Sequence, residues 1–181
     1  MHNVVKIIIL DDNVFDSELI KREIVRSGID HVSRIVSTKD AFEELLINFG
    51  PDIVISDFNL NTFNALEAFE IKNKICPDIP FIIISGSLRE KEGMKHFDKG
   101  ITDFLSKKRL YTLPTKILRS LKEFDRMMVN KRNEVKIDNQ YKTLNEIADL
   151  QSHQMRVPIV HIRGLYDLFN FDDPTDPINA E

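Results

Sequence analysis

Three short, strongly apolar runs constrain the fold of this chain more than any other feature of its sequence. They lie at residues 4–10, 53–55 and 81–84 and consist mostly of valine and isoleucine. Continuous β-branched runs of this kind are typical of strands buried on both faces of a parallel sheet. Weaker strand patterns at residues 33–36 and 102–105 raise the expected number of strands to five.

Helical patterns separate the expected strands. The first has an apolar face formed by Phe15, Leu19, Ile20 and Ile24 and stops at Gly28. Three more helices are expected around residues 38–49, 66–71 and 88–99. Strands that alternate with helices form right-handed βαβ units, which predicts an open, doubly wound parallel α/β sheet. In such sheets functional residues gather at the carboxyl ends of the strands.

From about residue 113 the strand signals stop and one long helical pattern follows. Apolar residues recur at alternating spacings of four and three, which is the heptad seam of a coiled coil. The seam positions are Ile117, Leu121, Phe124, Met128, Ile137, Tyr141, Leu144, Ala148, Gln151, Met155, Pro158, Ile162, Leu165 and Phe169. A helix of that length would reach roughly 75 Å, well beyond a small domain. We therefore expect it to pair with a second copy and make the chain a homodimer.

Composition excludes several classes of protein. The 181 residues include 25 basic and 29 acidic side chains, and this net charge of -4 argues against nucleic acid as a main partner. The single cysteine, Cys76, rules out an internal disulfide and a cysteine-built zinc site. No signal-peptide pattern begins the chain, and no apolar stretch approaches the roughly 18 residues that cross a bilayer. We expect a cytoplasmic protein without a membrane partner.

Polar residues stand at the carboxyl ends of the expected strands, where functional residues gather in a parallel sheet. Asp11 and Asp12 come directly after the first run, and Asp57 follows the run at residues 53–55. Three bare carboxylates would raise one another's pKa, and a divalent cation removes that repulsion. Oxygen ligands alone favour Mg²⁺. Ser85 ends a further strand and Lys107 follows the last one, and a hydroxyl and an ammonium group there suit a phosphoryl group carried on an aspartate.

Each of these residues also has an ordinary explanation when it is taken alone. Asp11 and Asp12 could serve as turn and capping residues before a helix. Asp57 could be a loop acid, and Lys107 could belong to a solvated basic cluster with Lys108 and Arg109. Together, however, these explanations require five polar groups to fall at consecutive strand ends by accident. We therefore interpret them as one site.

The constellation resembles the receiver domain of two-component response regulators over about residues 4–122. The resemblance implies an acidic pair at Asp11 and Asp12, a phosphoacceptor at Asp57, a switch hydroxyl at Ser85 and the lysine at Lys107. It further places the aromatic switch residue at Phe104 and a main-chain metal ligand at Asn59. It implies a flavodoxin-like (CheY-like) five-stranded sheet of order 2-1-3-4-5, a Mg²⁺ cofactor, and a histidine kinase or phosphotransfer protein as phosphodonor.

Two departures from this family pattern bear on the site. The family places a proline, joined by a cis bond, after its lysine, whereas Lys108 stands here. A cis bond without proline costs about 3 kcal/mol, so this bond could be trans and Lys107 could be placed differently from the family's lysine. The switch hydroxyl is Ser85 rather than the commoner threonine, which keeps the hydrogen bond and loses a methyl contact.

A second motif lies on the long helix. Ser152, His153, Arg156 and Pro158 resemble the phosphoacceptor box of sensor histidine kinases. In that box His153 would be phosphorylated, and Pro158 would kink the helix just beyond it. Kinases of this family commonly carry an acid after the histidine, whereas Gln154 stands here and cannot act as a base. The chain also has no recognisable ATP-binding domain, so whether it is an enzyme is left open.

These patterns divide the chain into three expected parts. Residues 1–125 would form the receiver, residues 126–170 a linker and the first helix of a kinase-type dimerisation segment, and residues 171–181 a truncated loop. The leading hypothesis is Mg²⁺-dependent phosphoryl acceptance on Asp57 that switches a dimerising helix. The alternative is an N-terminal fragment of a receiver-containing histidine kinase that autophosphorylates on His153. A haloacid-dehalogenase-type phosphohydrolase and an interaction module with a vestigial pocket remain further possibilities.

Overall fold

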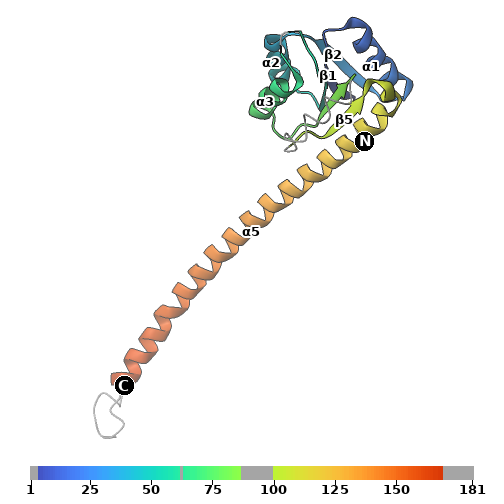
Figure 1. Cartoon of the computed structure of the whole chain (residues 1–181). Coiled ribbons are helices and arrows are strands. Elements are labelled where there is room, and N and C mark those ends of the chain that lie inside the picture. Colours follow the sequence, from blue (N-terminus) through green and yellow to red (C-terminus); the bar gives the residue numbers. More distant parts are fainter. Residues whose placement is uncertain (1–3, 62, 87–99, 169–181) are drawn as a thin grey trace, which may run out of the picture. The chain divides into compact units, whose positions relative to one another are not determined.

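The computed structural model describes residues 4–61, 63–86 and 100–168 (Figure 1). Within the helix at the C-terminal end, the side chains at 153, 155, 157, 165, 167 and 168 lie outside the described part. The chain divides into two compact units, Met1–Met128 and Val129–Glu181.

A five-stranded parallel sheet organises the first unit. Its strands are β1 (Val5–Leu10), β2 (His31–Val36), β3 (Ile53–Asp57), β4 (Phe81–Ser85) and β5 (Asp103–Ser106). They are hydrogen-bonded in the order β2-β1-β3-β4-β5, and every neighbouring pair is parallel. The predicted fold class and strand order are therefore confirmed. Two strands run past their apolar sequences, so that Asp57 and Ser85 are the last residues of β3 and β4.

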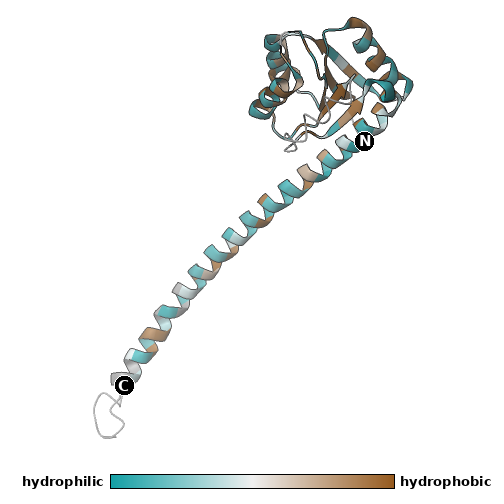
Figure 2. Ribbon diagram, in the orientation of Figure 1, coloured by the Kyte–Doolittle hydropathy of each residue, from teal (hydrophilic) through white to brown (hydrophobic). Residues whose placement is uncertain are grey.

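Helices cover both faces of this sheet, as a doubly wound fold requires. On one face, α1 (Val14–Arg26) and the first turns of α5 (Leu113–Leu168) pack against alternate residues of β1, β3 and β4. On the other face, α2 (Lys39–Asn48) and α3 (Ala65–Ile75) pack against the intervening residues. Figure 2 shows the resulting apolar sheet between more polar helices. The expected helix at residues 88–99 lies outside the described residues.

The apolar face of α1 differs from the expected one. Ile20 and Ile24 are buried, as expected, and Ser17 completes the buried stripe. Phe15 and Leu19, however, are 83% and 45% exposed, so the prediction that they face the core is wrong. Phe15 lies two residues before the buried Ser17, and Leu19 lies one residue before the buried Ile20. Because each residue turns the helix by about 100°, neither side chain points in the same direction as the buried stripe. A helix side chain can therefore be apolar without facing the core.

The long helix predicted after residue 113 is present as α5, a single element of 56 residues. Leu113, Ile117 and Leu121 are buried in the core of the first unit. In the second unit the large apolar side chains with a described exposure are all exposed, among them Ile137 at 51%, Tyr141 at 63% and Leu144 at 60%. Pro158 lies inside α5, which continues beyond it without a break between elements.

Candidate functional site

Three carboxylates meet at the carboxyl ends of β1 and β3. One oxygen each from Asp11, Asp12 and Asp57 can be chosen so that all three lie within 4.8 Å of one another. Asp11 and Asp57 are buried, at 3% and 7% exposure, and Asp12 is half-buried. Parallel pairing of β1 with β3 brings them together, because Leu10 lies beside Ser56 and the chain leaves both strands at the same edge. The predicted acidic cluster is therefore present.

Asp11 has one carboxylate oxygen with a hydrogen-bond partner and one without. Its Oδ1 accepts a hydrogen bond of 2.8 Å from the backbone N–H of Asn13, but its Oδ2 is buried and accepts none. Burial raises the pKa of Asp11 to about 6, with the charge of Asp57 adding to the rise and the Asn13 amide opposing it. An orphaned carboxylate oxygen beside two other carboxylates is a site where a hard cation would replace lost solvation.

Asp57 has a partner on each oxygen. Its Oδ1 accepts a hydrogen bond of 2.9 Å from the backbone N–H of Phe58, and its Oδ2 accepts one of 2.9 Å from Nζ of Lys107. Burial nevertheless raises the pKa of Asp57, although the hydrogen bond and the charge of Lys107 oppose that rise. The two donors hold the side chain in one orientation at the end of β3.

Lys107 reaches the cluster from the start of η2, a 3-10 helix at Lys107–Thr112 that follows β5. No peptide bond in the described residues is cis, so the bond to Lys108 is trans. Lys107 still donates a hydrogen bond to Asp57, so the family's proline is not needed to place the ammonium group beside that carboxylate. Burial lowers the pKa of Lys107, but hydrogen bonds to Asp16 and Asp57 outweigh this and raise it overall.

Asp16 is a member of the site that the sequence analysis missed. Its Oδ2 accepts a hydrogen bond of 2.7 Å from Nζ of Lys107, which makes the lysine a bridge between Asp16 and Asp57. Asp16 lies in the first turn of α1, whose N-cap, Asn13, accepts hydrogen bonds from the backbone of Phe15 and Asp16. The signal available in the sequence was this placement, because the helix after the first strand begins beside the strand ends.

The remaining predicted site residues lie around the cluster. Ser85 is buried at the end of β4, and Phe104 lies half-buried in β5 against the core on the α2 and α3 face. Asn59 forms an isolated bridge with Asn64 in the loop after β3. Oδ2 of Asp12 accepts a hydrogen bond of 2.9 Å from the backbone N–H of Asn61 in the same loop. The roles expected for Ser85, Phe104 and Asn59 stay predictions.

The donor set fits Mg²⁺. All the candidate ligand atoms are oxygens, and Mg²⁺ prefers oxygen ligands and usually keeps several waters beside one or two carboxylates. The buried Oδ2 of Asp11 has an unused lone pair, and the three carboxylates carry more negative charge than Lys107 neutralises. Asp11, Asp12 and Asp57 would therefore hold the ion, with the main chain of Asn59 as the further expected ligand.

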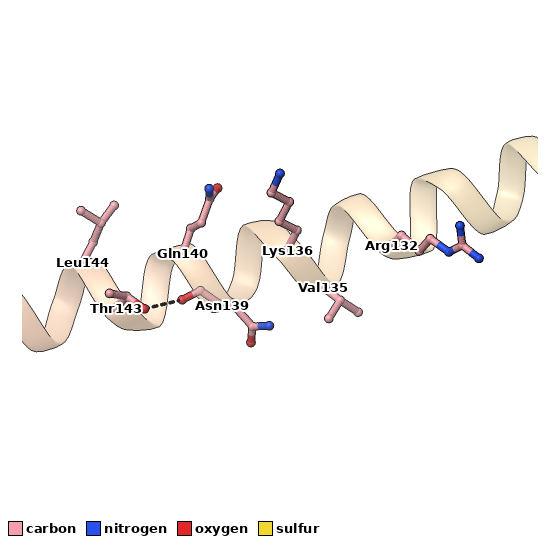
Figure 3. Close-up of a pocket in the computed structure, with 7 residues that line it drawn as sticks. All are labelled: Arg132, Val135, Lys136, Asn139, Gln140, Thr143 and Leu144. Carbon is pink, nitrogen blue, oxygen red and sulfur yellow. Dashed lines mark hydrogen bonds between the residues drawn. The ribbon is translucent and has the colours of Figure 1, made fainter.

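Along α5, residues between Arg132 and Leu144 form an open surface. Figure 3 shows its lining residues on one helix, with Lys136, Gln140 and Leu144 on one side and Val135 and Asn139 on the other. Because no second element closes it, we do not interpret this surface as a ligand cavity. It contains none of the predicted site residues.

His153, the second predicted phosphoacceptor, has a helical backbone within α5. Its side chain lies outside the described residues, so its proposed phosphorylation stays a prediction. No helix among residues 4–61, 63–86 and 100–168 combines the length and the apolar character needed to span a membrane.

A family profile described as the response regulator receiver domain matches residues 7–117. A CheY-like receiver domain protein from Methanospirillum hungatei JF-1 is similar in structure, with a TM-score of 0.60 and 20% identity over 69% of this chain and 99% of that chain. A receiver domain protein from Clostridium thermocellum gives a TM-score of 0.60 at 19% identity over 68% and 99% of the two chains. The response regulator domain of Thermotoga maritima CheB gives a TM-score of 0.54 at 18% identity, over 67% of this chain and 96% of that chain. At these identities the likeness shows the fold alone. No curated protein matches the sequence.

Proposed function

The chain belongs to the response regulator receiver domain family, and we propose that it accepts a phosphoryl group on Asp57 with the help of Mg²⁺. Membership of this family places it in two-component phosphorelay signalling, in which receivers take phosphoryl groups on an aspartate. The observation that carries the proposal is the cluster of Asp11, Asp12 and Asp57 within 4.8 Å, with Nζ of Lys107 2.9 Å from Asp57.

In the proposed reaction, an oxygen of the Asp57 carboxylate attacks the phosphorus of the donor. A new O–P bond forms, and the bond between phosphorus and the leaving group breaks. With acetyl phosphate the leaving group departs as acetate with the bonding electron pair; with a phosphohistidine it is the imidazole, which then takes up a proton. Asp57 must be ionised to attack, and its hydrogen bonds from Phe58 and Lys107 favour the ionised form against the effect of burial.

The other residues of the site neutralise charge around the transferring group. The Lys107 ammonium is placed to contact an oxygen of the phosphoryl group, because its Nζ lies 2.9 Å from Oδ2 of Asp57. When bound, Mg²⁺ would offset the negative charge that develops on the phosphoryl oxygens. Ser85, at the end of the neighbouring strand, would donate its hydroxyl to the same group, and Phe104 would change its packing in response.

A direct test is incubation of the chain with acetyl phosphate. With Mg²⁺ we expect one added phosphoryl group by intact mass, stable in acid and labile in base, as an acyl phosphate should be. With a chelator in place of Mg²⁺ we expect no addition. An unmodified chain in both conditions would contradict the proposal and favour an interaction module with a vestigial pocket. In the cell the donor would be a histidine kinase or a phosphotransfer protein.

We further propose that the second unit pairs with a second copy of itself and forms the output of the switch. Its exposed apolar residues Ile137, Tyr141 and Leu144 follow the four–three spacing of a helix pair. An isolated helix gains little stability in water without burying such a stripe. Pairing of two copies would bury these residues and explain why they are apolar.

Leu144→Glu is therefore expected to shift the chain from dimer to monomer in sedimentation velocity. A charge at a buried seam position costs several kcal/mol, which would weaken the dimer by on the order of 100-fold or more. The matched control is Asn139→Glu, because Asn139 lies on the other side of the helix from Leu144 (Figure 3). A monomeric wild-type chain, or equal effects of the two variants, would contradict pairing along this seam.

A further inference from the structure

The ion pair between Asp16 and Lys107 is as short as any contact in the site. Nζ of Lys107 lies 2.7 Å from Oδ2 of Asp16 and 2.9 Å from Oδ2 of Asp57. The side chains of Lys107 and Asp16 are 25% and 26% exposed, whereas that of Asp57 is 9% exposed. One ammonium group therefore bridges a deep carboxylate and a shallower one.

The bridge connects three separate parts of the fold. Asp16 comes from the first turn of α1, Lys107 from the start of η2 and Asp57 from the end of β3. A lysine side chain has four freely rotating carbon–carbon bonds and three N–H donors, so a single contact leaves its ammonium group loosely placed. A second charged hydrogen bond from an independent element fixes its position.

The second carboxylate also changes how much positive charge Asp57 receives. With Asp16 as a competing partner, the ammonium is shared between the two acids instead of belonging to Asp57 alone. The charge of Asp16 acts on Asp57 in the direction opposite to that of Lys107. Burial is the main cause of the raised pKa of Asp57, and the charge of Asp16 adds to it, so the contribution of Asp16 to the proposed reaction must come from where it holds the ammonium group.

We propose that Asp16 is a positioning residue, which holds the Lys107 ammonium group at the mouth of the acidic cluster, where it can contact a phosphoryl group on Asp57. This inference rests on the proposed phosphoryl acceptance at Asp57 for its consequence, but the anchoring of Lys107 can be observed without it. Asp16 is not proposed to contact the phosphoryl group or Mg²⁺. Its effect should therefore depend on Lys107 being present.

The anchoring is tested by measuring how fast the ammonium hydrogens of Lys107 exchange with water. The rate is measured by NMR on the ¹⁵N-labelled chain, and the Lys107 signal is the one that disappears in Lys107→Met. We expect Asp16→Asn to speed this exchange by about fivefold, because the amide oxygen lacks the full negative charge with which the Asp16 carboxylate holds the ammonium group. The matched control, Glu18→Gln, removes the same charge from an exposed position on the same helix and should leave the exchange unchanged. An unchanged rate in both Asp16→Asn and Asp16→Ala would overturn the proposal.

The consequence for the reaction is tested by a double-mutant cycle on the rate of modification by acetyl phosphate at saturating Mg²⁺. We expect Asp16→Asn to slow the rate by about fivefold in the wild-type background and by less than about twofold in the Lys107→Met background. Equal slowing in both backgrounds would mean a general effect of charge and would overturn the positioning role. If the wild-type chain is not modified at all, the proposed function fails, while the ammonium exchange still decides whether Asp16 anchors Lys107.

Discussion

Asp57→Asn is expected to abolish modification by acetyl phosphate, leaving less than about 1% of the wild-type rate. Asparagine has nearly the same shape as aspartate, so it can still accept the hydrogen bond from Phe58 through its amide oxygen. Its amide oxygen carries no full negative charge, however, and cannot form an acyl phosphate by attack on phosphorus. The measurement is the phosphoryl content by intact mass over time, in the presence of Mg²⁺.

Two controls show whether the loss of modification is specific to Asp57. The variant should retain its fold, because burial raises the pKa of Asp57 and so disfavours the charged form that asparagine removes. Asp40→Asn, which makes the same change at an exposed residue of α2, should be modified like the wild type. A phosphoryl group that persists on Asp57→Asn would show that another residue is the acceptor and would refute the assignment.

Asp11→Asn is expected to stabilise the Mg²⁺-free chain at neutral pH. The pKa of Asp11 is about 6 in the folded chain against 3.8 for an ordinary aspartate, so folding favours its protonated form. The contribution of Asp11 to stability is fully present below pH 3.8 and is lost as the pH rises through about 6. One pKa unit corresponds to about 1.4 kcal/mol, so roughly 3 kcal/mol is lost by pH 7. Asparagine does not titrate and avoids that loss.

The measurement is urea unfolding in a chelator between pH 4 and pH 8. The variant and the wild type should have similar stability near pH 4, and the variant should become the more stable by up to about 3 kcal/mol by pH 7 to 8. Asp40→Asn should follow the wild type across this range. A wild-type chain that gains stability relative to Asp11→Asn as the pH rises would show that the carboxylate is stabilised in the fold.

Mg²⁺ should remove most of this difference in stability. Binding to the folded wild type adds about 2.7 kcal/mol at a concentration 100 times its Kd. Loss of a group that only orients a metal ligand already costs 10- to 100-fold in affinity, so loss of the ligand Asp11 should cost at least about 100-fold. Titration calorimetry with Mg²⁺ alone measures this directly. An unchanged affinity in Asp11→Asn would remove Asp11 from the metal site.

The position of the acidic cluster was predictable because it depends on sheet topology. Asp11 and Asp57 each follow an apolar run, and parallel strands bring their carboxyl ends to one edge whatever the details of packing. Asp16 was not predictable in the same way, because its contact with Lys107 depends on how α1 is rotated over the sheet. The same rotation exposes Phe15 and Leu19, which the apolar pattern had placed in the core.

The sequence by itself determined the parallel sheet, the strand ends that carry the three carboxylates, and the long helix from Leu113. Each of these follows from a local pattern: an apolar run, a polar residue at its end, or a repeated spacing along one helix. Only the tertiary structure decided that the Oδ2 of Asp11 lacks a partner and that Lys107 is shared between Asp57 and Asp16. Burial and the sharing of a charge depend on distances between side chains from separate elements, and no local pattern contains those distances.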